Sequence, residues 1–408
     1  MKIKFLSALL SIIFGIVVNT TAQYVHQVKD ISQRTEPSYP YDLIVTDSLL
    51  YFTAYDKEHD LGLYATDGTQ NGIQLLKVLE NSVTNLSSHP RIYHQLEEDY
   101  LYFDNFNNGV CRSDGTAAGT KDLFPNKSIS GFIPFDSAIY FLSDSGLYKI
   151  KNDTVSLVKQ IISYYYSNGA IIIYNGYIYF SGYDSLSGAE LWRSDGTTAG
   201  TQLFYDFTPG PYNSLDDFRP ILAVQNNTLF ITADDSVHGP EIWVSDGTVP
   251  GTNRLNLANT IAPKYFERTL SINNKLIINA TDSIGTYHLW TSDGTSGGTS
   301  LLIADTNYNY GISAKEIIYN GYLYIPVQQK PLAIPDLYAL LKTDGTAAGT
   351  SIVKNNLNKH IVATLTVLND DFYFIAPDTS NVDHICKADT NLNFQLTYQF
   401  DSLYKATT

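Results

Sequence analysis

The 408-residue chain is poor in cysteine and in charge, and each shortage excludes a class of protein. Two cysteines cannot make a disulfide framework, so stability must come from packing. Charged residues make up 16% and hydrophobic residues 44%, which is enough apolar material for a folded core. The net charge is −15, from 26 basic and 41 acidic side chains, and the basic residues form no cluster. We therefore expect no nucleic-acid partner and no binding to anionic lipid surfaces.

Motifs that would name a reaction are also missing. The sequence contains no His-x-x-x-His or Cys-x-x-Cys spacing, no Gly-x-Ser-x-Gly elbow and no phosphate-binding glycine loop. Carboxylates are plentiful, but no spacing singles out a pair for glycoside hydrolysis. We therefore assign no catalytic residue and no cofactor from the sequence, and calcium is the one metal that we consider.

The first 22 residues have the three parts of a secretory signal peptide. Lys2 and Lys4 are followed by the uncharged run 5–18 and then by small residues ending at Ala22. The run is shorter than the roughly 20 residues that span a bilayer, and no second long apolar run follows. We expect a mature chain of residues 23–408 that is secreted or on the cell surface and is not inserted in the membrane.

A repeated phrase is the strongest signal in the chain. Asp-Gly-Thr occurs six times, a further Gly follows five residues after each Asp, and Thr follows that Gly in five copies. The six aspartates are Asp67, Asp114, Asp195, Asp246, Asp293 and Asp344. Degenerate copies lie at 147–154 and 385–390, which gives eight units of about 48 residues. Seven units would remain if the segment near Asn152 were an insertion.

Each unit has the pattern of four short strands. In residues 219–257, apolar runs at 221–224, 228–233, 241–245 and 253–257 are separated by Asn-, Asp- and Gly-rich turns, with no helical period. The fold prediction is all-β: a β-propeller of about eight four-stranded antiparallel blades, in one domain covering residues 23–408. Residues 24–31 and 394–400 both have the pattern of a fourth strand for the last blade, and the sequence does not choose between them.

The best copies, Glu-Leu-Trp-Arg-Ser-Asp-Gly-Thr at 190–197 and Glu-Ile-Trp-Val-Ser-Asp-Gly-Thr at 241–248, resemble the ELWxxDGT-repeat proteins. These are secreted proteins of Bacteroidetes-type bacteria, and the family is defined by its repeats rather than by an activity. Many members carry a C-terminal sorting domain. This chain ends at Thr408 directly after its last repeat, so the periplasm is an alternative location. The turn also resembles the Asp-box of sialidase-type propellers, which implies a structural role for each aspartate.

Other residues have both a chemical and a structural interpretation. Acidic loops between the second and third strands could bind calcium, with Asp184, Glu190, Asp234, Asp235 and Glu241 as the candidate ligands, or could simply be a solvated rim. Trp192, Trp243 and Trp290, with Tyr64 and Tyr148 at the same repeat position, are expected between blades. Cys111 and Cys386 occupy that position too and are expected to be small buried residues.

These observations favour a secreted, non-catalytic binding or scaffolding protein, acting in adhesion or in glycan or protein recognition. The expected partner is an extracellular protein or glycan, and we expect a monomer. The alternative is an extracellular, glycosidase-like hydrolase whose site is assembled from several blades on one axial face. The sequence leaves open whether the protein is an enzyme, although the missing motifs favour binding.

Overall fold

The computed structural model describes the chain in segments between residues 41 and 399. They are 41–45, 49–55, 61–69, 72–79, 92–93, 100–104, 109–125, 129–162, 171–215, 222–255, 265–281, 286–303, 307–310, 316–330, 337–358, 366–368, 371–377, 383–388 and 394–399. All regular structure in these segments is β-strand. No helix in them is long and apolar enough to cross a membrane. The predicted signal peptide and the predicted strand at 24–31 lie outside the described residues.

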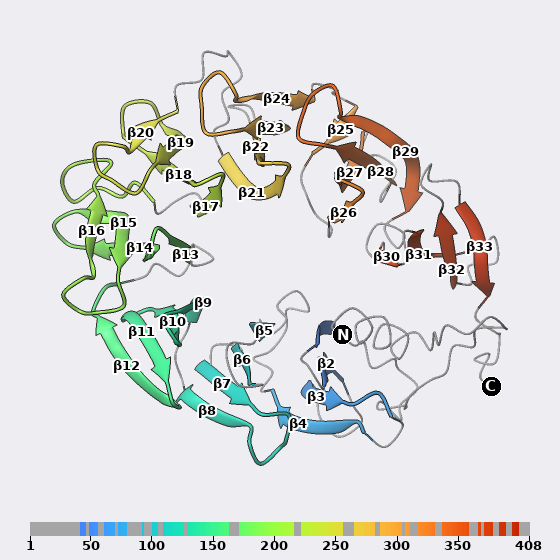
Figure 1. Ribbon diagram of the computed structural model, residues 1–408, viewed down its shortest axis with the longest axis horizontal. Coiled ribbons are helices and arrows are strands. Elements are labelled where there is room, and N and C mark those ends of the chain that lie inside the picture. Colours follow the sequence, from blue (N-terminus) through green and yellow to red (C-terminus); the bar gives the residue numbers. More distant parts are fainter. Residues whose placement is uncertain are drawn as a thin grey trace. The chain divides into compact units, whose positions relative to one another are not determined.

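The strands form eight antiparallel sheets in chain order, seven of four strands and one of five (Figure 1). Sheets 1 to 4 contain β1 (Tyr41–Val45), β2 (Leu50–Ala54), β3 (Gly62–Thr66) and β4 (Gln74–Val78); β5 (Ile92–Tyr93), β6 (Leu101–Asp104), β7 (Gly109–Ser113) and β8 (Lys121–Pro125); β9 (Ile129–Phe135), β10 (Ala138–Ser143), β11 (Gly146–Lys151) and β12 (Thr154–Lys159); β13 (Ile171–Tyr174), β14 (Tyr177–Asp184), β15 (Gly188–Ser194) and β16 (Gln202–Tyr205).

Sheets 5 to 8 follow the same plan, with one additional strand in sheet 7. They contain β17 (Leu222–Gln225), β18 (Thr228–Asp234), β19 (Pro240–Ser245) and β20 (Asn253–Arg254); β21 (Tyr265–Ile272), β22 (Lys275–Thr281), β23 (Tyr287–Ser292) and β24 (Ser300–Ile303); β25 (Tyr308–Asn309), β26 (Ile317–Tyr319), β27 (Tyr322–Gln329), β28 (Leu337–Thr343) and β29 (Ser351–Asn358); β30 (Thr366–Leu368), β31 (Asp371–Pro377), β32 (Asp383–Ala388) and β33 (Phe394–Gln399). This succession of blades is the architecture of a β-propeller.

The predicted four-stranded plan is found in seven of the eight described sheets, and sheet 7 has one additional strand. The four runs predicted in residues 219–257 are β17 to β20. The degenerate unit near Asn152 forms sheet 3 by itself, so the repeats give eight sheets rather than seven. In sheet 8, β33 pairs with β32 and supplies the fourth strand.

Two local features repeat from sheet to sheet. The first hairpin of several sheets turns on two residues with positive φ, such as Asn226 and Asn227 at 49° and 54°, which is the turn that the Asn-rich sequence predicts. The pairing of the third and fourth strands shifts register directly before the repeat's aromatic position, as at Leu289/Trp290. The same shift at Leu147/Tyr148 identifies sheet 3 as a true repeat in spite of its altered turn.

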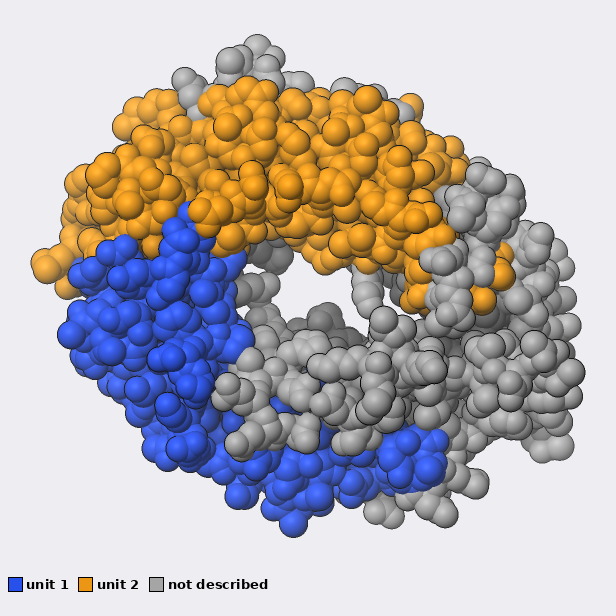
Figure 2. Space-filling model, viewed as in Figure 1, with its two compact units in different colours: residues 1–178, 182–184, 193–202 blue, residues 179–181, 185–192, 203–408 orange. Residues whose placement is uncertain are grey.

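The chain divides into two compact units (Figure 2). The described residues of unit 1 fall within 1–178, 182–184 and 193–202, and those of unit 2 fall within 179–181, 185–192 and 203–408. In unit 1, Leu63 of sheet 1 packs with Phe103 and Cys111 of sheet 2. Cys111 is fully buried, as the sequence predicts.

In unit 2, consecutive sheets also share their cores. Trp290 of sheet 6 belongs to one cluster with Phe230 and Ile242 of sheet 5, and it is 1% exposed. Leu289, its neighbour on β23, points into the next cluster with Leu323 of sheet 7. Alternating side chains of the third strand thus fill the two interfaces of each blade, and the prediction that Trp290 lies between blades is confirmed.

Candidate functional site

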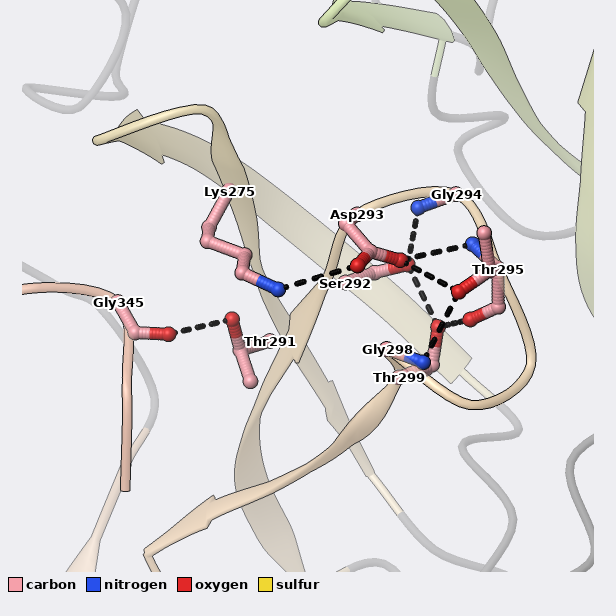
Figure 3. A network of polar contacts seen from close by, with 9 residues as sticks. All are labelled: Lys275, Thr291, Ser292, Asp293, Gly294, Thr295, Gly298, Thr299 and Gly345. Atoms are coloured by element: carbon pink, nitrogen blue, oxygen red, sulfur yellow. Dashed lines mark hydrogen bonds and ion pairs between the residues drawn. The ribbon is translucent and has the colours of Figure 1, made fainter. Parts of the chain in front are cut away.

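The repeated Asp-Gly-Thr phrase forms a hydrogen-bonded turn between the third and fourth strands (Figure 3). In sheet 6, Asp293 Oδ1 accepts hydrogen bonds from the amide and the hydroxyl of Thr295, at 3.0 and 2.7 Å. The amide of Gly298 donates to the Thr295 hydroxyl at 3.0 Å. Lys275 Nζ lies 3.2 Å from the second carboxylate oxygen of Asp293.

A chain of hydroxyl groups closes the turn. The Gly294 amide donates to Ser292 Oγ at 3.1 Å, and the Thr299 hydroxyl donates to the carbonyl oxygen of Thr295 at 2.7 Å. Because the Thr299 proton is used there, the 2.7 Å contact between Ser292 and Thr299 must be a hydrogen bond donated by Ser292. This network explains why Thr follows the second glycine of the phrase.

The same contacts recur in the other copies. Each aspartate accepts from the Thr two positions later, in the pairs Asp67–Thr69, Asp114–Thr116, Asp195–Thr197, Asp246–Thr248 and Asp344–Thr346. Hydrogen bonds from the Thr hydroxyl and amide hold the pKa of all six carboxyl groups below the usual range. These aspartates shape the turns, and in each copy Oδ1 is occupied within the turn itself.

The Asp-Gly glycine of one sheet also packs on the preceding sheet, against an aromatic residue of its second strand. The pairs are Gly115 on Tyr51, Gly196 on Tyr140 and Gly294 on Phe230. Gly115 and Gly196 each have a φ of 89°. A Cβ would meet Leu49 and then the Tyr51 hydroxyl at Gly115, and the Tyr140 hydroxyl at Gly196. Both the backbone conformation and the close approach therefore require glycine at these positions.

The carbonyl group of that glycine is an acceptor at the same interface. Thr291 Oγ1 donates to the carbonyl oxygen of Gly345 at 2.8 Å (Figure 3). Gln74 Nε2 donates to the carbonyl oxygen of Gly115 at 2.6 Å. The Asp-Gly turn thus fills a position between two sheets and satisfies a donor from the preceding sheet.

Sheet 3 differs because its third and fourth strands are joined by a two-residue turn. Asn152 and Asp153 have φ values of 49° and 59° and connect β11 directly to β12. Sheet 3 therefore has no Asp-Gly turn to place against Tyr102, which occupies in β6 the position of Tyr51 in β2. A cleft of about 500 Å³ lies there, between sheets 2 and 3 and within unit 1.

Aromatic and charged side chains line this cleft, which we call the turn cleft. Sheet 2 contributes Tyr100, Tyr102 and Arg112, and sheet 3 contributes Phe135, Lys151 and Asp153, among others. No His, Cys or Glu is present among the described residues that line it. This combination offers flat apolar faces with hydrogen-bonding groups at their edges.

Arg112 is the buried charge of the turn cleft. It is 7% exposed, and its Nη1 lies 2.5 Å from Asp153 Oδ1. Its guanidinium carbon stands 3.9 Å from the ring centroid of Tyr100. Nε of Arg112 is buried and has no hydrogen-bond partner among the residues that the structure describes. A buried donor without an acceptor is costly. Nε of Arg193, which stacks on Tyr177 in sheet 4, is buried in the same way, so a buried Nε belongs to the stacked arginine and does not by itself mark the turn cleft.

The stack of Arg112 on Tyr100 belongs to the repeat. Arg193 stands over Tyr177 at 4.6 Å, and Lys342 Nζ over Tyr322 at 3.7 Å. In each case the cation lies two residues before the repeat aspartate. Arg112 is thus positioned by the blade, while its ion pair with Asp153 comes from the altered turn of sheet 3.

The five candidate calcium ligands are not gathered into one group. Within the described segments, no three His, Cys, Asp or Glu side chains are placed to bind a metal ion. Asp184 is half-buried at the end of β14. The others bind protein groups: Asp234 accepts from the amide of Ser236, Asp235 contacts His238 Nδ1 at 2.7 Å, Glu241 lies 3.2 Å from Arg254 Nη1, and Glu190 binds Ser214 and Phe207.

Glu190 is the most strongly perturbed of these groups. It is fully buried, its Oε1 accepts from the Ser214 hydroxyl at 2.5 Å, and its Oε2 accepts from the Phe207 amide at 3.0 Å. Burial raises the pKa of Glu190 to about 8, and the nearby Asp206 carboxylate adds to this effect. The side chain ties β15 to residues 206–215, which connect sheets 4 and 5.

Backbone hydrogen bonds complete this connection. The amide of Ser214 donates to the carbonyl of Ala189, and the amide of Asp234 on β18 donates to the carbonyl of Ser214, both at 3.0 Å. Gly188, with a φ of 73°, lies directly against the backbone of Tyr212. Residues 188–190 and Asp234 are thus part of a structural junction between sheets 4 and 5.

Sequence reasoning missed both the turn cleft and the buried state of Glu190. The available signal for the cleft was the loss of Asp-Gly-Thr in the third unit. This loss is visible in the sequence, but it does not by itself indicate a cleft. For Glu190 no signal separates it from Glu241 at the same repeat position, although Glu241 is only half-buried.

Comparisons with known proteins add structural likeness alone. No protein-family model and no curated protein matches the chain. The computationally designed Ika8 protein is 11% identical, with 91% of this chain and 99% of that chain covered at a TM-score of 0.46. BamB from Moraxella catarrhalis is 12% identical (89% and 100% covered, TM-score 0.45), and oligopeptidase B from Trypanosoma brucei is 10% identical (87% and 54%, TM-score 0.48). The chain spans about half the length of the peptidases it matches. The β-propeller class is defined by the eight consecutive antiparallel sheets themselves.

Proposed function

We propose that this protein is a secreted, non-catalytic binding or scaffolding β-propeller that recognises an extracellular protein or glycan through the turn cleft. The cleft carries the proposal: its volume of about 500 Å³ lies in the range of roughly 300–1,000 Å³ typical of ligand sites. Aromatic rings beside a buried arginine provide both contact area and a directional donor. The acidic balance of the chain and the signal-peptide pattern support a location outside the cytoplasm, at the cell surface or in the periplasm.

The proposal includes membership of the ELWxxDGT-repeat family, which is supported by the repeated turn. Five of the six copies keep the whole hydroxyl network from the residue before Asp to the Thr after the second glycine. In a family defined by this network, the shared residues have a structural role. They do not determine the ligand, so individual members can bind different ligands. The site that distinguishes this chain is then expected where the network is interrupted.

The first experiment measures ligand binding by the mature protein, residues 23–408. Its thermal unfolding is followed with panels of oligosaccharides, peptides and chromogenic glycosides. A ligand at 100 times its Kd should add about 2.7 kcal/mol to stability. Arg112→Met keeps the bulk of the side chain and removes its donors, while Arg193→Met makes the same change in sheet 4, where Arg193 also stacks on a tyrosine.

We expect a stabilising ligand whose effect is lost in Arg112→Met and kept in Arg193→Met. Turnover of a glycoside that depends on Asp153 would instead make the protein a hydrolase. Ligand binding that is equal in both arginine variants would remove the turn cleft from the proposal.

A further inference from the structure

The occupant of the turn cleft can be inferred from what fills the same position elsewhere in the chain. In the interfaces of sheets 1 and 2, 3 and 4, and 5 and 6, an Asp-Gly turn lies against the aromatic residue of the second strand. Tyr102 of sheet 2 is the equivalent residue at the turn cleft, and the shortened turn of sheet 3 does not reach that position. This inference rests on the proposed function, because it names the ligand class of the same site.

The hydrogen-bonding chemistry of the position is also known from the repeat. Thr291 lies two residues before Asp293 and donates to the carbonyl oxygen of a glycine in the next sheet. Arg112 lies two residues before Asp114, so it occupies the position of Thr291. Its Nε is buried and has no acceptor among the described residues. A backbone carbonyl placed like that of Gly345 would supply one.

We propose that the turn cleft binds a glycine-containing β-turn of a partner protein, which docks where the other blades place their own Asp-Gly turn. Glycine is required because the turn packs with positive φ directly on a tyrosine, as Gly115 does on Tyr51. The carbonyl of that glycine accepts from Arg112. The partner's turn fills the interface between sheets 2 and 3. Recognition therefore depends more on the backbone conformation of the turn than on its side chains.

A saccharide could stack on the same tyrosines, but the position has two features that favour a peptide. Its floor is Tyr102, the equivalent of Tyr51 and Tyr140, on which the other interfaces pack a residue without Cβ. Its buried donor stands at the position of Thr291, which binds a peptide carbonyl. An unsubstituted sugar ring has no amide carbonyl, and an N-acetylated sugar carries one only on a side group, without the backbone of a turn. Glycan binding is therefore the competing outcome of the test.

The test uses a turn that the chain itself provides. A cyclised peptide with the sequence of residues 194–201, Ser-Asp-Gly-Thr-Thr-Ala-Gly-Thr, is titrated into the mature protein by calorimetry and by NMR of the arginine side chains. We expect saturable binding, at least tenfold weaker in Arg112→Met and unchanged in Arg193→Met. A peptide with Ala in place of its first glycine should lose at least tenfold in affinity.

A graft gives an independent measurement on the folded protein. Residues 152–153 are replaced by the same eight-residue turn, which should occupy the cleft from within and abolish peptide binding. The control graft is a Gly-Ser loop of equal length, which also removes Asp153 but lacks the turn's hydrogen-bond network. The control should keep at least part of the binding, and unfolding curves establish that both grafts are folded.

Each outcome decides between the alternatives. Peptide binding that persists in the turn graft, or that ignores the Gly to Ala change, overturns the inference. Oligosaccharide binding that depends on Arg112, without peptide binding, overturns the inference and leaves the proposed function standing. Absence of both peptide and oligosaccharide binding overturns the two together.

Discussion

Glu190 should make the stability of unit 2 fall as the pH rises. Its pKa is 4.5 in an exposed reference state and about 8 in the fold, because the carboxyl group is fully buried beside Asp206. One pKa unit corresponds to about 1.36 kcal/mol, so ionising Glu190 in the folded protein costs roughly 4 to 5 kcal/mol. The folded state holds this proton more tightly than the unfolded state. The stabilisation is therefore complete below pH 4.5, declines between pH 4.5 and 8, and is lost above pH 8.

The measurement is urea unfolding of the mature protein between pH 5 and pH 9, compared with Glu190→Gln. The glutamine keeps the size of the side chain and an acceptor for Ser214 or Phe207 but carries no charge to bury. The two proteins should be close in stability at pH 5. At pH 9 the variant should be more stable by several kcal/mol, with an upper limit near the roughly 4 to 5 kcal/mol worked out above.

Glu241→Gln is the matched control, since Glu241 has the same repeat position but is half-buried and paired with Arg254. It should not reproduce the gain at high pH. Equal stability of wild type and Glu190→Gln across the whole range would refute the argument. It would mean that the hydrogen bonds from Ser214 and Phe207 compensate for the burial of the charge.

The repeat and the N-terminal segment lead to three further predictions. Gly196→Ala should destabilise the fold by more than about 1 kcal/mol, because its φ is 89° and the new Cβ would meet Tyr140; chemical unfolding measures this, and an unchanged midpoint would contradict the packing argument. Asp293→Ala should cost about 1–2 kcal/mol by removing the acceptor of two hydrogen bonds, and the loss should shrink in acid as the wild-type carboxylate is protonated below its lowered pKa. N-terminal sequencing of the exported protein should begin at Gln23, whereas a retained Met1 would exclude cleavage.

The blade plan could be predicted because each of its elements has a local cause. Two-residue hairpin turns need positive φ at both residues, and the pair Asn226-Asn227 predicts such a turn from the sequence. The Asp-Gly-Thr turn uses contacts within seven residues, so its hydrogen bonds are implied by the spacing of Ser, Asp, Thr and Gly. Period-two alternation places Trp290 and Leu289 on opposite faces of one strand. In all these cases the interacting groups are neighbours in the sequence or repeat at a constant interval.

The candidate site could not be predicted in the same way, because it depends on contacts between different units of the repeat. Glu190 and Glu241 are indistinguishable in their repeat phrases. They differ because Glu190 meets the chain that returns at Phe207 and Ser214, while Glu241 meets Arg254 on its own sheet. The acidic loops were interpreted as possible calcium ligands from composition alone. In the structure the carboxylates of Glu190, Asp234, Asp235 and Glu241 bind protein groups, which composition does not reveal.

The turn cleft shows how a repeat protein can acquire a specific site without a new motif. In the interfaces of sheets 1 and 2, 3 and 4, 5 and 6, and 6 and 7, the Asp-Gly turn packs on the preceding sheet, so these interfaces are filled by the chain itself. Shortening one turn to Asn152-Asp153 removes that filling but keeps the tyrosine floor and the cation of the preceding blade, because both are needed for its own packing. Tyr102 and Arg112 then line a cleft at the position that an Asp-Gly turn fills in the other interfaces. A cleft formed by the loss of a turn keeps the residues that contact such a turn in the other interfaces. This is the physical reason to test a peptide turn as its ligand.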